Sequence, residues 1–160
     1  MHMHLLQAQV FPAILRGMPE LDDTTLATWR GFLNAHARVT RRISAELSAA
    51  GLPDLSWYDL LWALYRQPDR SLRVNELARE IVLSPPAMSR FVDRLAAAGC
   101  VRREPDPDDR RAQRVVLTEE GIDLLRRMWP VYKAGIEAHF AAHLGGSPQG
   151  IRAVLERIAE

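Results

Sequence analysis

The order of helical and extended patterns in this chain predicts a mainly α fold. We expect a winged helix-turn-helix with a small β-hairpin wing, and long helices that form a dimerisation domain. Three observations support this prediction. Residues 71–118 begin with a short helical pattern, a tight turn and a second helical pattern. The same segment ends with two short β-prone runs around a loop rich in turn-forming residues. Long amphipathic helical patterns lie on both sides of it.

The length of 160 residues suits one domain with a dimerisation arm, and the patterns divide the chain into three regions. Residues 1–23 are an N-terminal extension, within which residues 5–16 could form a helix. Residues 24–54 and 119–160 make up the helical dimerisation region. Residues 55–118 form the winged helix-turn-helix, which is the expected DNA-binding region.

The first long helix is predicted over residues 24–50, and Gly51 ends it as a C-cap. Its apolar side chains recur at helical spacing along one stripe. A second helix is expected to begin at Ser56, because Asp59 three residues later completes a pattern like a capping box. The stripe of the first helix consists of Trp29, Phe32, Leu33, His36, Val39, Ile43 and Leu47.

The second helix of the helix-turn-helix is predicted to begin at Ser84, whose hydroxyl should accept from a backbone N–H of the first turn. Pro85 and Pro86 fall in that turn, where a missing N–H costs little, and Gly99 ends the helix. The opposite face has small residues near its start and arginines one and two turns later, which suits a helix entering the DNA major groove end-on. An ordinary amphipathic helix with a solvated basic face is the alternative. The expected buried stripe is Met88, Phe91, Val92 and Leu95.

Two β-prone runs, residues 101–104 and 114–117, form the predicted wing. Asp109 lies two residues before Arg111 and is expected to hold that guanidinium at the loop tip. Arginine there suits a narrow, electronegative minor groove. A plain charged hairpin is the alternative, although the position directly after a helix-turn-helix argues against it. The charged residues of the loop are Asp106, Asp108, Asp109, Arg110 and Arg111.

The stretch SPPAMSRFVDRLAAAGCVRREPDPDDRRAQRVVLTEEG, which begins at Ser84, resembles the multiple-antibiotic-resistance regulator (MarR) family. The resemblance implies a ligand-responsive transcriptional regulator, a repressor that binds an inverted-repeat operator in double-stranded DNA as a homodimer. Two features depart from the family pattern: Pro85 and Pro86 replace a polar or basic pair, and Arg73 stands where a Ser or Thr cap is common. The residues expected to contact DNA are Ser84, Pro86, Ala87, Ser89, Arg90, Arg94, Asp109, Arg110 and Arg111.

The string WYDLLWALYR, from Trp57 to Arg66, resembles the urate-responsive branch of that family. This resemblance implies that an aspartate and an arginine, here Asp59 and Arg90, couple a ligand to DNA binding. The effector is accordingly expected to be a small aromatic anion. Core packing is the alternative interpretation of the aromatic side chains. The expected ligand-binding residues are Trp29, Trp57, Asp59 and Arg90.

The C-terminal part is predicted to form two helices of a dimer interface. Thr118 caps the first, whose two opening glutamates suit the positive end of the helix, and Pro130 is expected to bend it. Ser147 and Pro148 begin the second. The apolar positions are Leu124, Leu125, Met128, Val131, Ile136 and Phe140 in the first helix, and Ile151, Val154, Leu155 and Ile158 in the second.

Composition narrows the function classes. A net charge of +1 excludes nucleic-acid binding by bulk charge, so the basic groups must be placed individually. The chain contains no run of 18 apolar residues and its start lacks the basic region of a signal peptide, so a cytoplasmic protein without membrane contact is expected. The single cysteine, Cys100, excludes an internal disulfide and is expected to be buried.

No catalytic pattern emerges from the sequence. His139 and His143 lie four residues apart, but no glutamate adjoins them as in a zinc hydrolase. We therefore expect no metal site, no cofactor and no enzyme activity. The alternative to an operator-binding regulator is a winged-helix module that serves protein interaction and binds no operator.

Overall fold

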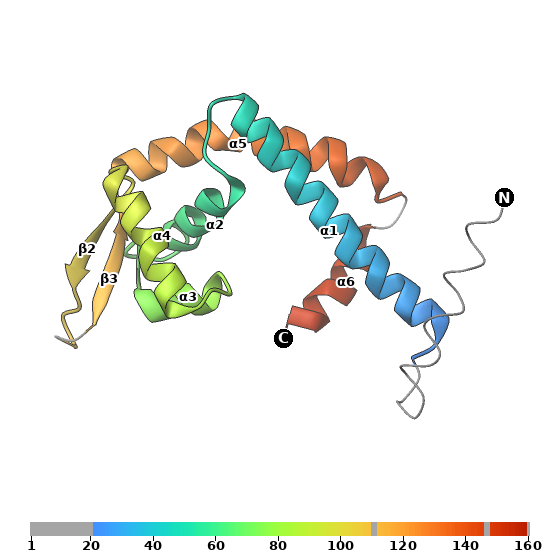
Figure 1. Cartoon of the computed structure of the whole chain (residues 1–160), viewed down its shortest axis with the longest axis horizontal. Coiled ribbons are helices and arrows are strands. Elements are labelled where there is room, and N and C mark those ends of the chain that lie inside the picture. Colours follow the sequence, from blue (N-terminus) through green and yellow to red (C-terminus); the bar gives the residue numbers. More distant parts are fainter. Residues whose placement is uncertain (1–20, 110–111, 146–147, 160) are drawn as a thin grey trace. The chain divides into compact units, whose positions relative to one another are not determined.

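The computed structural model describes residues 21–109, 112–145 and 148–159 (Figure 1). The chain divides into two compact units, residues 1–36 and 37–160, and helix α1 crosses the boundary between them. The predicted mainly α fold with a small β-hairpin is confirmed. The elements are α1 (Asp23–Ala49), α2 (Leu55–Tyr65), β1 (Ser71–Arg73), α3 (Val74–Glu80), α4 (Pro85–Ala97), β2 (Val101–Pro105), β3 (Gln113–Leu117), α5 (Glu119–His139), the 3-10 helix η1 (Ala141–His143) and α6 (Pro148–Ala159).

The first turns of α1, within the N-terminal unit, leave large apolar side chains open to solvent. Asp22 precedes the helix, and its Oδ1 accepts a hydrogen bond from the Thr25 N–H at 2.9 Å. The rings of Trp29 and Phe32 stack with centroids 6.0 Å apart, and both side chains, like that of Leu33, are about half exposed. The predicted bounds of the helix are confirmed to within one residue at each end. This half of its apolar stripe, however, is not covered by the described chain.

The second unit contains a three-stranded antiparallel sheet in the order β1-β3-β2. Ser71 lies opposite Val116 in the β1–β3 pair, and Val101 lies opposite Leu117 in the β2–β3 pair. The two predicted strands are confirmed, each one residue longer than expected, and they form the wing hairpin. The sequence did not predict β1, because three residues are too few to show a strand pattern and the strand exists only through its pairing with β3.

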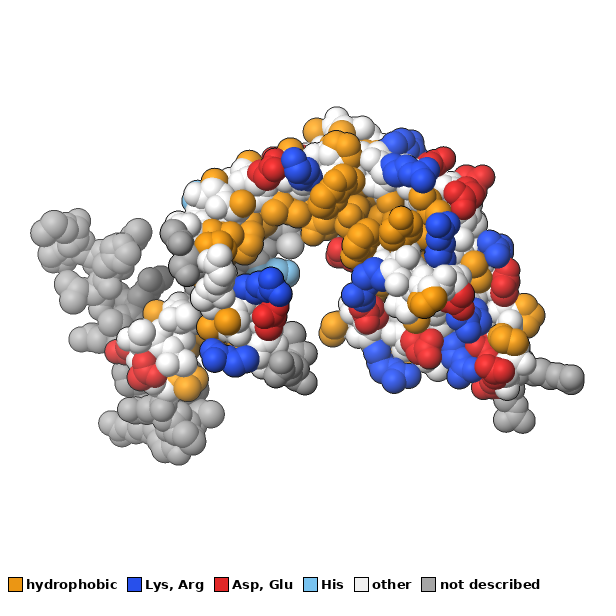
Figure 2. Space-filling view, turned by 180° about the vertical axis from the view of Figure 1, so that it is seen from behind, with side chains coloured by type: hydrophobic (Ala, Val, Ile, Leu, Met, Phe, Trp, Pro, Cys, Tyr) orange, Lys and Arg blue, Asp and Glu red, His pale blue; other side chains and the backbone are white. Residues whose placement is uncertain are grey.

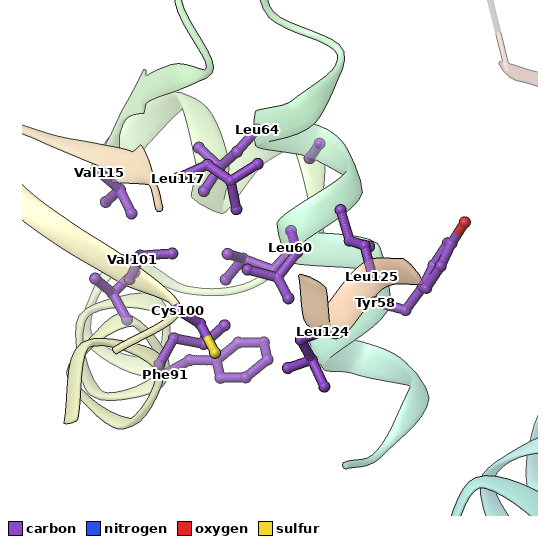
Figure 3. Close-up of a cluster of buried hydrophobic side chains, with 14 of the residues drawn as sticks. Tyr58, Leu60, Leu64, Phe91, Cys100, Val101, Val115, Leu117, Leu124 and Leu125 are labelled. Carbon is purple, nitrogen blue, oxygen red and sulfur yellow. The ribbon is translucent and has the colours of Figure 1, made fainter. Parts of the chain in front are cut away.

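The core of the second unit lies between α2, α4, the sheet and α5 (Figure 3). The predicted stripe of α4 is confirmed, because none of its four side chains is more than 4% exposed. Cys100 is buried as predicted, and burial raises the pKa of its thiol. Helix α1 contributes Ile43 and Leu47 to the same core. Further fully buried side chains are Leu60, Leu61, Leu64, Leu77, Val115 and Met128.

The start of α2 differs from the predicted pattern of Ser56 and Asp59. The helix begins at Leu55 and its N-cap is Asp54, whose Oδ1 accepts from the Ser56 N–H at 2.9 Å. A carboxylate accepts this hydrogen bond well, and its charge suits the positive end of the helix. The prediction of a start at Ser56 was therefore wrong, and the side chain of Asp59 takes no part in the cap.

Helix α4 begins and ends as predicted, except for one hydrogen bond. Ser84 is the N-cap, but its hydroxyl makes no capping bond, and Pro86 at the second helical position has no N–H to offer it. Gly99 adopts a φ of +74° after the last turn. The Cys100 N–H then donates to the carbonyl oxygen of Leu95 at 2.9 Å, which closes the helix end in the way that glycine permits.

The turn between α3 and α4 contains a strained residue. Val82 has a φ of +56°, and its side chain is 88% exposed. The Leu83 N–H donates to the carbonyl oxygen of Ala78 at 2.9 Å, so Val82 occupies the position at which helices commonly place glycine. A β-branched residue in the left-handed region costs on the order of 1–3 kcal/mol. The tight turn of the helix-turn-helix is thus maintained against local strain.

Helix α5 continues through Pro130 to His139, so the proline does not end it. The His139 Nε2 lies 2.6 Å from Oε1 of Glu46 on α1, whereas His143 belongs to η1. The two histidines therefore do not share one helix, although their i, i+4 spacing would allow one helix face to carry both. Within the described residues, no three His, Cys, Asp or Glu side chains gather as a metal site would require.

The final helix begins at Pro148, and Ser147 lies outside the described residues. Its apolar stripe remains open to solvent in the single chain, with Leu155 37% and Ile158 74% exposed. Across the described part of the chain, no helix combines the length and the apolar character needed to cross a bilayer.

The start of α5 packs tightly on the backbone that follows α4. The Thr118 hydroxyl accepts from the Gly121 N–H at 3.1 Å, as the predicted cap requires, and donates to the carbonyl oxygen of Gly99 at 2.6 Å. A Cβ at position 121 would lie 2.2 Å from the carbonyl oxygen of Cys100 and 2.7 Å from a methyl group of Leu117. Only glycine allows the helix to approach this closely.

We expect Gly121→Ala to lower the free energy of unfolding by about 1–3 kcal/mol, because the added methyl group collides with backbone that cannot rotate away. Gly31→Ala is the matched control, since no described atom lies within 4 Å of its added Cβ. In the control, alanine should favour the helix by about 0.5–1 kcal/mol. Urea unfolding followed by circular dichroism measures both variants. Equal stability of Gly121→Ala and the wild type would contradict the close contact.

Candidate functional site

The outer face of α4 carries the side chains that the sequence assigned to DNA. Ser84, Pro86, Arg90 and Arg94 are exposed, and Ala87 is half-buried at the edge of the same face. The guanidinium of Arg94 lies over the Phe91 ring, with Cζ 5.1 Å from the ring centroid. Neither arginine forms an ion pair with an acidic side chain of the described chain. Both charges are therefore available to a partner outside it.

Ser89, also expected at the DNA, is half-buried and contacts the wing. Arg103 on β2 donates from Nη2 to the carbonyl oxygen and the hydroxyl of Ser89, both at 3.1 Å. The same nitrogen donates to Oδ1 of Asp93 at 2.8 Å, and Nη1 donates to Oε1 of Gln113 on β3 at 3.0 Å. One guanidinium thus fixes the wing strands against α4. Sequence reasoning missed this role of Arg103, because its partners lie ten or more residues away in the chain.

A second arginine holds the base of the wing. Arg73, at the start of α3, donates from Nε to Oδ2 of Asp106 at 2.7 Å and from Nη2 to Oδ1 at 2.8 Å. The carboxylate also accepts from the backbone N–H groups of Asp108 and Asp109, both at 3.0 Å. The Asp106 side chain has no exposed surface, although it comes from a surface loop. It therefore joins the wing to the helix-turn-helix as a paired, fully hydrogen-bonded charge.

The charge of Asp106 is strongly favoured in the fold. The hydrogen bonds from Arg73 lower the pKa of this carboxyl from its ordinary 3.8 to about 2, and the two backbone N–H groups add to the effect. The sequence predicts that Asp109 orients Arg111, but Arg110 and Arg111 lie outside the described residues. Asp106 instead orients Arg73, the residue that departs from the family's usual Ser or Thr cap. That departure was the signal by which the sequence could have revealed the pair.

A pocket of about 620 Å³ opens between α2 and α5. Figure 2 shows hydrophobic side chains gathered over these helices on the face seen from behind. Asp59 is an exposed residue of the pocket lining; partial desolvation raises the pKa of its carboxyl, and the charge of Asp54 raises it further. Burial likewise raises the pKa of Tyr58 and Tyr132 in the walls. The lining residues are Tyr58, Asp59, Trp62, Tyr65, Ile122, Leu125, Arg126, Trp129, Tyr132 and Ile136.

The residues expected to bind a ligand are dispersed in the single chain. Asp59 lines the pocket, whereas the Trp57 ring packs edge-on against Phe91 with centroids 6.5 Å apart. Trp29 belongs to the N-terminal unit. Arg90 lies on the exposed face of α4, and the described ion pairs do not include one between it and Asp59. Of the four residues, the structure places only Asp59 in the pocket.

The Arg73–Asp106 pair predicts a distinct acid dependence of stability. Because the folded-state pKa of Asp106 is lowered, its contribution is fully present above the ordinary value of 3.8 and is lost as the pH falls through about 2. Asp106→Asn should therefore be less stable than the wild type at pH 6, and the difference should shrink between pH 3.8 and 2. Urea unfolding across this pH range measures it.

Glu104→Gln is the matched control for that experiment, because it removes an exposed ion pair with Arg102 in the same wing. Exposed pairs contribute little, so this variant should stay close to the wild type at every pH. A loss of stability in Asp106→Asn that is the same at pH 2 and pH 6 would contradict the assignment.

The comparisons with known proteins agree with this architecture. The MarR family model matches residues 50–112. The HTH-type transcriptional regulator PrsX of Escherichia coli is 29% identical over 96 residues, which cover 60% of this chain and 57% of PrsX. The chain thus spans little more than half the length of that relative. The HTH-type transcriptional repressor IacR of Pseudomonas putida is 25% identical over 121 residues, 76% of this chain and 71% of IacR.

The helix-turn-helix (α3 and α4) and the wing strands (β2 and β3) together form what we call the reading head. The likeness to solved structures extends beyond it. The crystal structure of Sco3205, a MarR family transcriptional regulator from Streptomyces coelicolor in complex with DNA, matches with a TM-score of 0.77 and 31% identity. The match covers 88% of this chain and 89% of that one. These relatives are regulators of transcription and not enzymes, in agreement with the sequence expectation. The recognition helix, the wing and the long helices around them are shared with proteins of one kind, and the chain belongs to the MarR family of winged helix-turn-helix transcriptional regulators.

Proposed function

We propose that this chain is a cytoplasmic transcriptional repressor that binds an inverted-repeat operator as a homodimer and releases it when a small ligand binds. The observation that carries the proposal is the charge arrangement around α4. Arg73 and Arg103 are tied to acidic partners that hold the wing in place. Arg90 and Arg94 extend from the exposed helix face without acidic partners in the described chain. Such a surface suits phosphate and base contacts.

The arginines of α4 and those of the wing would contact different grooves of the DNA. Helix α4 would enter the major groove, with Arg90 reading a base edge and Arg94 contacting the phosphate backbone. The wing would reach the flanking minor groove through Arg110 and Arg111, with Asp109 beside them. Ser84, Pro86 and Ala87 would approach the DNA at the start of the helix, and Ser89 would act through Arg103.

Two substitutions test this division. We expect Arg94→Ala to weaken binding to all sequences alike by about 1–3 kcal/mol, as the loss of a phosphate contact should, and Arg90→Ala to change the sequence preference as well. The matched control is Lys133→Ala, which removes a positive charge from an exposed i,i+4 pair on α5. Operator fragments are first selected with the purified wild-type protein, and affinities are then measured at fixed salt.

The same experiment also tests the alternative function, a winged-helix module that serves protein interaction and binds no operator. If no DNA fragment is enriched, or if both arginine variants keep the wild-type affinity and preference, the helix is not a reader. The winged-helix interaction module would then be favoured.

The homodimer is supported by the apolar surface that the single chain leaves open. Trp29, Phe32 and Leu33 on α1 are about half exposed, and so are several apolar side chains of α6. Each of these two apolar patches, taken by itself, favours association. Two reading heads on one dimer would also match the symmetry of an inverted repeat.

The apolar stripe of α6 provides the test of dimerisation. We expect the double variant Val154→Glu, Leu155→Glu to shift the protein toward monomer and to lose tight operator binding at the same time, because each half-site would then be bound alone. The control Arg152→Ala breaks an exposed pair with Glu156 on the same helix and should leave both properties unchanged. Light scattering and operator titration report the two effects. A double variant that remains dimeric would refute the role of α6.

The ligand response is proposed from the pocket between α2 and α5. Its volume of about 620 Å³ lies in the range of small-molecule sites. Helix α5 lines the pocket. It begins at the residue after Thr118, and strand β3 of the wing ends at the residue before Thr118. A ligand that moved α5 relative to α2 would therefore act on the position of the reading head. Asp59 is the proposed polar contact of the effector.

A further inference from the structure

The pocket between α2 and α5 is walled by a continuous set of aromatic rings. Tyr58 stacks on Trp62 with centroids 6.2 Å apart and on Trp129 at 6.3 Å. Its edge contacts Tyr132 at 4.7 Å, and Trp62 stacks on Tyr65 at 5.5 Å. Trp62, Tyr65 and Trp129 are each more than 40% exposed, so these three rings are not part of the packed core. The faces of these rings are electron-rich, whereas their edges are electropositive.

The polar groups of the pocket make it acidic. Asp59 forms no hydrogen bond or ion pair with any residue that the structure describes. Arg126 also lines the pocket, but its Nη1 donates to Oδ1 of Asp123 at 2.7 Å, which compensates its charge. The uncompensated charge in the pocket is therefore the carboxylate of Asp59. Asp59 is exposed in the single chain, but partial desolvation by the pocket walls raises the pKa of its carboxyl, so a counter-ion beside it would favour the charged form.

We propose that this pocket binds an organic cation: an ammonium or phosphonium ion with an aromatic or branched apolar body, paired with Asp59 and enclosed by the rings of Tyr58, Trp62, Trp129 and Tyr132. Ring faces attract cations, and a carboxylate beside them adds a direct ion pair. An aromatic anion, the class implied by the sequence resemblance, would meet the unpaired carboxylate and the negative ring faces. The inference deepens the proposed function, because it rests on the pocket being the effector site.

The test uses two probes of the same size and shape with opposite charge, tetraphenylphosphonium and tetraphenylborate. Binding to the wild-type protein without DNA is followed by tryptophan fluorescence and calorimetry at pH 7.5. We expect the cation to bind at least about tenfold more tightly than the anion. Asp59→Asn should weaken the cation about tenfold or more and remove the preference. Glu137→Gln, which removes a negative charge elsewhere on α5, should leave the affinity for the cation unchanged.

The pH dependence gives a second readout. Cation binding requires the ionised carboxylate, so affinity should fall as the pH drops through the raised pKa of Asp59, and Asp59→Asn should remove this dependence. Equal or tighter binding of tetraphenylborate would overturn the proposal, as would an Asp59→Asn variant with wild-type affinity for the cation. Binding of neither probe would also overturn it and would indicate that a second copy of the chain covers the pocket.

A parallel titration with operator DNA separates this inference from the proposed function. If the cation binds in the expected way but leaves operator affinity unchanged, the cation site stands and the ligand-responsive function fails. If operator binding requires Arg94 while neither probe binds, the DNA-binding function stands and the cation site fails.

Discussion

The close approach of α5 to the backbone of Cys100 is the constraint on which most of the structure depends. Gly121 has no side chain, so the first turn of α5 lies against a carbonyl oxygen at the end of α4, and Thr118 bonds both segments. This one contact places the long helix against the reading head. The same helix then lines the aromatic pocket and supplies Leu124, Leu125 and Met128 to the core. Recognition helix, wing and pocket are thus arranged around a single packed junction.

The arginines of the reading head serve two purposes, which the nearly balanced net charge makes necessary. Arg73, Arg103 and Arg114 are bound to carboxylates and join segments far apart in the chain. Their charges are compensated, so they add rigidity to the wing and little to the field that DNA would experience. Arg90 and Arg94 remain for the proposed contacts with DNA. Because the fixed arginines hold the wing strands against α4, the free ones have a rigid support.

The pocket has the opposite character from the proposed DNA surface. Its rings and the Asp59 carboxylate form an acidic, aromatic site on α2 and α5, whereas the exposed face of α4 is basic. Both surfaces belong to one compact unit. The proposed ligand, by changing the packing of α2 on α5, would act on the wing through few intervening residues, since β3 leads directly into α5. Coupling of 1–3 kcal/mol, typical of allosteric sites, is about the energy of a few such contacts.

The sequence by itself determined the local features of this protein. The stripe of α4, the glycine that ends it, the Thr118 cap and the wing strands were all predictable, because each depends on residues within a few positions of one another. Local reasoning failed where two signals competed, as at Asp54 and Ser56. It also failed where geometry beyond one turn was needed, as for His139 and His143. Strand β1 exists only because β3 lies beside it.

The tertiary structure alone decided the contacts between distant residues. Arg73 and Asp106 are separated by 33 positions; the unusual arginine marks position 73, but nothing in the sequence around Asp106 identifies that residue as its partner. The resemblance pointed to Asp59 as a ligand residue but joined it to Trp57 and Arg90. In the structure Trp57 packs against Phe91, and Asp59 lines a pocket whose other walls include aromatic rings from two helices. The reason is physical: spacing along the chain specifies which face of a helix a side chain occupies, but the chemistry of a site depends on which other faces are packed against it.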